Sequence, residues 1–117
     1  MEGAYLTNVE AELWEPFDLG DGRILGEVHW LRSEDDGTGS FVHSGVWRVN
    51  ATEPPEPFSY EMSINETIHV LGGEVHIQVE DGDMLVIREG DVASFRRGLV
   101  TTWTIVHTPF KEFFVLS

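Results

Sequence analysis

The sequence contains no cysteine, so it forms no disulfide and offers neither a thiolate metal ligand nor a cysteine nucleophile. Any metal site would have to be built from histidine and carboxylate side chains. Long apolar runs are also missing, since no segment approaches the roughly 18 consecutive apolar residues that a membrane helix needs. The acidic first residues, MEGAYLTNVEAELWEP, lack the basic and apolar pattern of a signal peptide. We therefore expect a cytoplasmic protein without a membrane partner.

Basic residues are scarce. The 117 residues include 7 Lys and Arg against 21 Asp and Glu, which gives a formal net charge of −14. A nucleic-acid interface needs clustered basic side chains to displace counterions from phosphates, and here only Arg96 and Arg97 stand together. We predict that nucleic acid is not a partner. The acidity favours the solubility of a small domain, and a preference for cationic ligands is the alternative interpretation.

Apolar and polar residues alternate with a period of two along most of the chain, which is typical of half-buried β-strands. The pattern predicts no amphipathic helix and nine short strands, at residues 24–32, 40–49, 58–63, 66–71, 74–80, 84–88, 91–95, 102–107 and 110–116. LGG at 71–73 and EDGD at 80–83 are predicted hairpin turns, because glycine adopts a positive φ without strain. The sequence thus predicts a single all-β domain, with residues 24–117 as a sandwich or barrel and residues 1–23 as an N-terminal extension.

Side-chain parity predicts which residues point into this barrel. In the strand at 40–49, Ser44 and Arg48 share the outer face. The predicted inward set is Phe41, His43, Trp47, Val49, Phe58, Tyr60, Met62, Glu66, Ile68, Val70, Val75, Ile77, Val79, Thr101, Trp103 and Ile105. Glu66 is the exception in this set, because a buried carboxylate is unfavourable unless it is paired, metal-bound or protonated. Either Glu66 serves a ligand in a pocket lined by Trp47, Tyr60 and Trp103, or it lies at the barrel mouth and only hydrogen-bonds backbone or water.

The pieces GVW, NETIHVLGG, GD followed by F and G, and TW occur in this order over residues 45–116. In this order and spacing they resemble the cupin superfamily. They are most similar to the small single-domain group that includes ethanolamine-utilization cupins and the (S)-ureidoglycine aminohydrolase type. The resemblance implies an RmlC-like jelly-roll β-barrel. It does not imply one activity, because cupins include isomerases, dioxygenases, hydrolases and binding proteins.

The histidines that hold the metal in most cupins are missing. The resemblance implies four metal-ligand positions, and of these this sequence keeps only Glu66. The histidine positions of the first motif hold Ser59 and Glu61, or Tyr60 and Met62 with the shorter spacing, and Thr101 stands at the histidine of the second motif. One carboxylate without imidazoles would not hold iron, manganese or zinc against water and cellular chelators. We therefore expect no cofactor and no metal, with a weak site built from Glu66 and His43 left open.

Together these features predict a metal-independent cupin that binds a small organic ligand. Glu66 is the candidate catalytic residue, as an acid or base in an isomerase, lyase or hydrolase step. The candidate ligand-binding residues are His43, Trp47, Tyr60, Met62, Thr101 and Trp103. The alternatives are a non-catalytic metabolite-binding or assembly module and a metal-dependent, aminohydrolase-like cupin. A homodimer is also expected, because the apolar stretch ILGEVHWL could pair with a neighbour's sheet edge.

Overall fold

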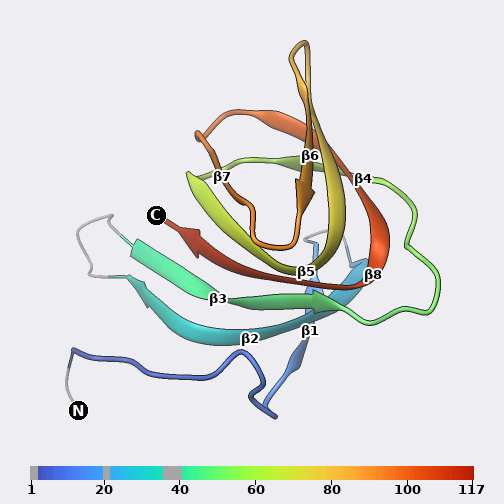
Figure 1. Ribbon diagram of the computed structural model, residues 1–117. Coiled ribbons are helices and arrows are strands. Elements are labelled where there is room, and N and C mark those ends of the chain that lie inside the picture. Colours follow the sequence, from blue (N-terminus) through green and yellow to red (C-terminus); the bar gives the residue numbers. More distant parts are fainter. Residues whose placement is uncertain (1–2, 20–21, 36–40) are drawn as a thin grey trace.

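The computed structural model describes residues 3–19, 22–35 and 41–117. Over these ranges the chain forms eight antiparallel β-strands and no helix (Figure 1). The strands are β1 (Glu15–Asp18), β2 (Ile24–Asp35), β3 (Phe41–Val49), β4 (Phe58–Glu61), β5 (Glu66–Val79), β6 (Met84–Arg88), β7 (Val92–Phe95) and β8 (Val100–Leu116). The all-β fold predicted from the alternation is confirmed. Within the described ranges, nothing helical is long and apolar enough to cross a membrane.

Two long strands, β5 and β8, pair along nearly their whole lengths and belong to both layers of the fold. The first half of β5 and the second half of β8 lie in one layer, with strand order β1-β2-β3-β8-β5-β7. Their other halves lie in the second layer, with strand order β4-β8-β5-β6. Figure 1 shows both strands curving from one layer to the other. The side chains between the two layers therefore form one enclosed core.

The bend in β5 lies where Gly73 passes β8. A Cβ atom on Gly73 would lie 2.6 Å from the carbonyl oxygen of His107 and 2.8 Å from that of Pro109, and the φ of Gly73 is +82°. Glycine is required here because any side chain would meet backbone atoms in a left-handed conformation. The hairpin turn predicted at residues 71–73 is therefore wrong, and the strands predicted at 66–71 and 74–80 are one bent strand. The strands predicted at 102–107 and 110–116 are likewise one strand, β8.

The hairpin turn predicted at residues 80–83 is confirmed. The backbone N–H of Val79 donates to the carbonyl oxygen of Asp83 over 3.0 Å, and that of Gly82 donates to the carbonyl oxygen of Val79 over 2.9 Å. Asp81 has a φ of 58°, which aspartate tolerates better than most side chains do. This turn connects β5 to β6, so its glycine and aspartates indicated the local structure correctly.

The N-terminal region contributes a strand that was not predicted. β1 pairs with β2, with Glu15 opposite Val28 and Asp18 opposite Ile24. The indole N–H of Trp30 donates to Oε1 of Glu15 over 2.7 Å. The prediction that the barrel begins at residue 24 is therefore wrong. Since β1 already pairs with the edge of β2 that was expected to meet a second copy, that edge no longer supports the homodimer, which stays a prediction.

The segment that precedes β1 crosses the outer face of β3 and β8. The ring of Trp14 lies 3.8 Å from the guanidinium carbon of Arg48. The ammonium of Lys111 donates to the carbonyl oxygen of Val9 over 3.1 Å and pairs with the carboxylate of Glu10 over 3.2 Å. Basic side chains on this outer face therefore have partners supplied by the N-terminal segment.

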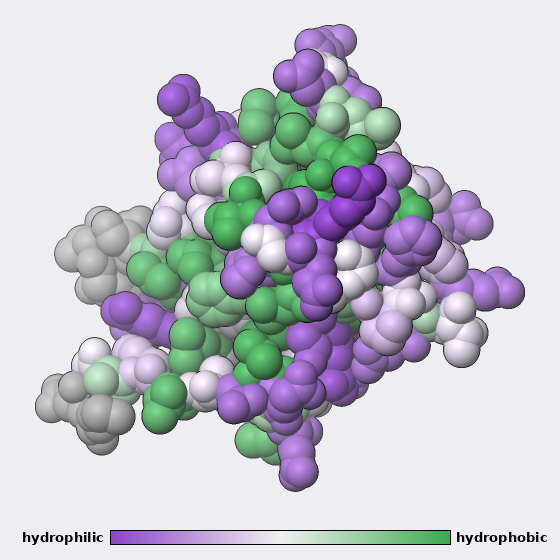
Figure 2. Space-filling model, viewed as in Figure 1, coloured by the Kyte–Doolittle hydropathy of each residue, from purple (hydrophilic) through white to green (hydrophobic). Residues whose placement is uncertain are grey.

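The core between the two layers is aliphatic and aromatic. Ile68, Val75 and Phe110 are fully buried, and each belongs to one of the two long strands. Figure 2 shows hydrophilic residues on the protruding parts of the surface, with hydrophobic residues exposed between them. Most of the acidic side chains in the described ranges are exposed or half-buried. The few acidic side chains that are buried require a separate explanation.

Candidate functional site

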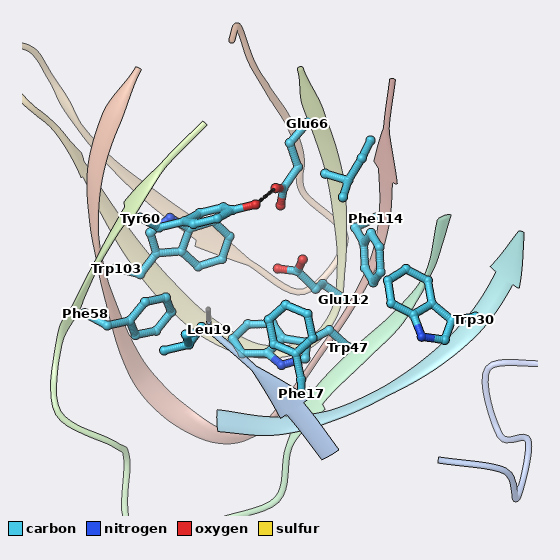
Figure 3. Close-up of a pocket in the computed structure, with 11 residues that line it drawn as sticks. Phe17, Leu19, Trp30, Trp47, Phe58, Tyr60, Glu66, Trp103, Glu112 and Phe114 are labelled. Carbon is cyan, nitrogen blue, oxygen red and sulfur yellow. Dashed lines mark hydrogen bonds between the residues drawn. The ribbon is translucent and has the colours of Figure 1, made fainter. Parts of the chain in front are cut away.

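A pocket with a cavity volume of about 60 Å³ lies between the two layers of the barrel. Since a cavity needs a volume of roughly 10–15 Å³ to hold one water molecule, this pocket has room for a few waters or a small organic molecule. Its walls come from residues on β1, β2, β3, β4, β5 and β8 and from the segment after β1 (Figure 3). The lining residues are Phe17, Leu19, Trp30, Trp47, Phe58, Tyr60, Glu66, Trp103, Glu112, Phe114 and Leu116. Most of them are aromatic.

Glu66 lies at the start of β5 and points into this pocket (Figure 3). Its side chain is buried, and the phenol of Tyr60 donates a hydrogen bond of 2.8 Å to its Oε1 atom. Tyr60 lies on β4, which is held by pairing with β8. The two residues therefore come from different strands and meet only because β8 brings β4 and β5 together. This hydrogen bond fixes the orientation of the Glu66 carboxyl group.

Glu112 is a second buried carboxyl group in the pocket, and it was not predicted as a site residue. It lies on β8, opposite Trp47 of β3 and Val70 of β5, and is only 2% exposed. Its Oε1 atom has no hydrogen-bond partner in the part of the chain that the structure describes. Figure 3 shows its carboxyl group facing the space below Glu66. The available signal was parity, because Glu112 shares the face of the buried residues Phe110 and Phe114.

Burial controls the protonation of both carboxyl groups. Desolvation raises the pKa of Glu66 to about 7, and the hydrogen bond from Tyr60 opposes this rise. Desolvation and then the negative charge of Glu66 raise the pKa of Glu112 well above its usual range. Desolvation and the charge of Glu66 also raise the pKa of Tyr60, so its phenol remains a hydrogen-bond donor. Because the two carboxyl groups share one pocket, the negative charge of one opposes ionisation of the other.

Four of the predicted site residues meet at the pocket. Glu66, Trp47, Tyr60 and Trp103 all line it. Trp47 and Trp103 contact each other edge to face, with ring centroids 6.2 Å apart, and Tyr60 contacts Trp103 with centroids 5.9 Å apart. Parity predicted these positions correctly because they lie in regular parts of their strands. Their roles in binding or catalysis stay predictions.

Three other predicted ligand-binding residues do not line the pocket. Met62 is 1% exposed and packs in the apolar core. The hydroxyl of Thr101 donates to the carbonyl oxygen of Tyr60 over 2.6 Å and accepts from the indole N–H of Trp103 over 3.0 Å. Both residues are buried as predicted. Neither residue lines the cavity, so their contact with a ligand stays a prediction, and the hydrogen bonds of Thr101 hold the two aromatic residues that do line it.

His43 is also outside the pocket. It is half-buried near the beginning of β3, where its Nδ1 atom is hydrogen-bonded to the hydroxyl of Ser33 over 2.7 Å. Its ring lies 6.1 Å from that of Trp30, which lines the pocket. Phe41, predicted to point inward on the same face, is 36% exposed. Parity predicted the face correctly, but this end of β3 extends past the enclosed part of the barrel, so neither side chain reaches the cavity.

The side chains of the pocket that could bind a metal do not match the histidine-rich metal centre of the cupin superfamily. Ser59 and Glu61 are exposed, and the hydroxyl of Thr101 is already hydrogen-bonded within the protein. The polar groups that do line the pocket are those of Tyr60, Glu66 and Glu112. Among the residues that the structure describes, no group of three or more His, Cys, Asp and Glu side chains could hold a metal ion.

Residues 37–114 match the EutQ-like cupin domain family. A putative ethanolamine utilization protein Q from Salmonella typhimurium LT2 shares 23% identity over 88% of this chain and 76% of its own, with a TM-score of 0.64. A DUF861 family protein from Thermotoga maritima shares 29% identity over 62% of this chain and 76% of its own, with a TM-score of 0.54.

An RmlC-like cupin with a double-stranded β-helix fold from Methanocaldococcus jannaschii shares 14% identity over 100% of this chain and 90% of its own, with a TM-score of 0.61. The cupin jelly-roll fold predicted from the sequence is thereby confirmed. The chain matches no functionally curated protein sequence.

Proposed function

Because the chain belongs to the EutQ-like cupin family, we propose that its aromatic pocket binds a small organic molecule without a metal and that Glu66 exchanges a proton with it. The observation that carries this proposal is the presence of two buried carboxyl groups, Glu66 and Glu112, in one cavity. Buried carboxyl groups are unfavourable for folding unless their hydrogen-bonding capacity is used. A ligand in the cavity would supply hydrogen bonds to these carboxyl groups.

The walls of the pocket support binding of an organic molecule. Aromatic side chains from β1 to β4 and β8 supply the large apolar contact surface that is typical of small-molecule sites. The polar groups are few, and in Figure 3 the carboxyl groups of Glu66 and Glu112 and the hydroxyl of Tyr60 face the same space. A ligand would therefore be oriented by its polar end, which would face the Glu66 and Glu112 carboxyl groups.

The protonation state of Glu66 supports the proposed proton exchange. With a pKa of about 7, both the acid and the carboxylate forms are populated at neutral pH, which suits a general acid or base. Tyr60 donates to Oε1 and leaves Oε2 for the ligand. In the proposed step, the carboxylate of Glu66 takes a proton from one atom of the ligand, or from a water molecule that attacks the ligand. The resulting acid then gives this proton to a different atom of the ligand, or to the group that leaves as its bond to the ligand breaks. The net reaction is then an isomerisation, an elimination or a hydrolysis.

The alternative is a binding module that holds a metabolite, or assembles with another component, without converting it. The small cavity favours this alternative, because a volume of about 60 Å³ leaves little space for a co-substrate beside a ligand. A metal-dependent, aminohydrolase-like activity is not proposed, because the donor groups of the pocket do not match the histidine-rich centre. The two remaining candidates differ in whether a bound ligand is consumed.

The test is a screen of thermal stability across a metabolite library, followed by product analysis for each compound that raises the melting temperature. Glu66→Gln is the informative variant, and Glu61→Gln, an exposed carboxylate on β4, is its matched control. Binding should weaken about tenfold or more in Glu66→Gln, since a charge-assisted hydrogen bond contributes roughly 1.5–3 kcal/mol. The control should bind like the wild type.

Product formation by the wild type that is lost in Glu66→Gln would establish catalysis. Binding without any product would establish the alternative, a binding module. A Glu66→Gln variant that is destabilised yet binds its ligand normally would contradict any role for Glu66 in the site. A library without a single binder would contradict the proposed function as a whole.

A further inference from the structure

Among the residues that the structure describes, the lining of the pocket includes acidic side chains and no basic one. Of its eleven lining residues, Glu66 and Glu112 are acidic and none is Lys, Arg or His. The basic residues next to lining residues in the chain are His29, Arg48 and Lys111, which adjoin Trp30, Trp47 and Glu112, so strand alternation sends them to the opposite face. There Arg48 contacts Trp14 and Lys111 contacts Glu10. A ligand with a negative charge would therefore find repulsion in this cavity and nothing to neutralise it.

The pocket is also poor in hydrogen-bond donors. Each of its three tryptophans uses its indole N–H outside the cavity. Trp30 donates to Glu15 over 2.7 Å, Trp47 to the carbonyl oxygen of Leu25 over 3.0 Å, and Trp103 to the hydroxyl of Thr101 over 3.0 Å. These indoles therefore offer the cavity apolar ring surface rather than N–H groups.

The phenol of Tyr60 is already bonded to Glu66, and the carboxyl groups of Glu66 and Glu112 can donate only while they are protonated. On the acceptor side, Oε1 of Glu112 is buried and unpartnered within the described residues. Aromatic rings around a carboxylate form a known type of site for organic cations, because the ring faces carry negative charge density and the carboxylate supplies the counter-charge. The geometry therefore favours a ligand that brings both the donor and the positive charge.

We propose that the ligand of the pocket is a small organic cation, a primary or methylated ammonium ion that lies against the tryptophan rings and faces the carboxyl groups of Glu66 and Glu112. This inference rests on the proposed function, since it names the class of ligand for the same pocket. The volume of about 60 Å³ restricts the cation to a few non-hydrogen atoms around the nitrogen. Binding of the cation would favour the ionised forms of both carboxyl groups and so release any proton that they hold.

Two matched pairs of probes test the charge requirement directly. The first pair is choline and its uncharged analogue in which a carbon atom replaces the nitrogen. The second is propylamine, protonated at neutral pH, and propanol. Titration calorimetry should show that the cation in at least one pair binds about tenfold or more tightly than its neutral partner. Glu112→Gln should weaken binding of that cation by a similar factor and leave the neutral partner unaffected. Glu61→Gln is again the control and should bind both like the wild type.

The outcomes separate this inference from the proposed function. Neutral probes that bind as tightly as the cations would overturn the inference and leave a small-molecule pocket in place. The inference is also overturned, and the small-molecule pocket again remains, if none of the four probes binds while the metabolite library yields uncharged or anionic ligands. If neither the probes nor the library yields a binder, both proposals fail. A Glu112→Gln variant that is folded and binds the cation normally would also overturn the inference.

Discussion

Lys111 and Glu112 are neighbours on β8, yet their side chains meet opposite surroundings. Lys111 points to the outer face, where its ammonium contacts Val9 and Glu10. Glu112 points inward and is only 2% exposed. The same contrast holds on β3, where Trp47 lines the pocket and Arg48 lies beneath Trp14 on the outer face. The two faces of the β3–β8 pair therefore differ. On the outer face, Arg48 and Lys111 have partners, whereas on the inner face Oε1 of the buried Glu112 has none among the described residues.

This difference shows where the fold tolerates an unfavourable arrangement. Outer-face ion pairs such as Lys111–Glu10 are partly solvated, and such pairs contribute about 0–1 kcal/mol. The inner face buries two carboxyl groups together, which opposes folding unless they hold a proton. Stability alone would favour apolar residues at both positions. We take the inner arrangement as the mark of a site and the outer arrangement as structural, and four changes test that distinction.

The largest effect is expected for Trp47→Ala on the inner face. Trp47 is 6% exposed and packs against Phe58, Trp103 and Phe110. Removing a buried tryptophan leaves a cavity and should lower the free energy of unfolding by about 3–5 kcal/mol. Chemical denaturation of the variant and the wild type measures this loss. A loss below about 1 kcal/mol would mean that the inner face is loosely packed.

A smaller effect, dependent on pH, is expected for Glu112→Gln. Burial raises the pKa of Glu112 in the folded protein above its usual value of 4.5, so the folded protein keeps a proton that the unfolded chain has released. The stability that the wild type has below that value is therefore lost as the pH rises toward the folded-state pKa. The variant has no such group. It should match the wild type at about pH 4 and be the more stable of the two proteins at about pH 8.

Denaturation curves at the two pH values measure this difference for Glu112→Gln. Glu61→Gln is the control, and because its carboxylate is exposed it should follow the wild type at both. If Glu112→Gln shows the same pH dependence as the wild type, the buried pair is not the source of that dependence.

A still smaller effect is expected on the outer face for Trp14→Ala. Loss of the ring over Arg48 removes a partly exposed cation–π contact, which contributes about 0.5–1 kcal/mol. Ligand binding should not change, since Trp14 does not line the pocket. Leu13→Ala is the matched control, because Leu13 is 80% exposed and should contribute almost nothing. If Trp14→Ala weakened binding in the pocket, the two faces would be coupled.

No effect is expected from removal of metal. A metal ion would be another way to neutralise the inner carboxylates, but the pocket offers no imidazole for it. Protein purified without a histidine tag should carry well under one equivalent of transition metal, and EDTA should leave the melting temperature unchanged. A tightly held, stoichiometric metal would contradict the metal-independent function.

Strand alternation predicted much of the inner face. It placed Glu66, Tyr60, Trp47 and Trp103 on the correct side because these residues lie in regular strands with fixed parity. The same alternation places Glu112 on the inner face, because Phe110 and Phe114 share that face. A glutamate next to Lys111 nevertheless resembles an ordinary surface residue, so the sequence did not identify Glu112 as a site residue. Its significance comes from burial and an unpartnered oxygen, which are tertiary properties.

Other features depend on contacts that no local pattern encodes. Gly72 and Gly73 would look the same in a hairpin and in a bent strand, and only the approach of the His107 and Pro109 carbonyls decides between them. β1 is four residues long and contains a proline, so it shows too little alternation to be recognised. Its Phe17 nevertheless lines the pocket. His43 has inward parity but lies where the barrel no longer encloses it.

The most direct test of the proposed site is a titration of Glu66 and Glu112 by NMR with isotope-labelled glutamate carboxyl groups, assigned with the Glu66→Gln and Glu112→Gln variants. If burial in one pocket controls the pair, the Glu66 signal should titrate at a pKa of about 7, and the Glu112 signal should titrate well above the usual 4.5. Each variant should also shift the pKa of the carboxyl group that remains, because the two groups titrate as a pair. If both groups titrate near the usual value and neither variant affects the other, the carboxyl groups are solvated and independent, and the proposed site does not exist in this form.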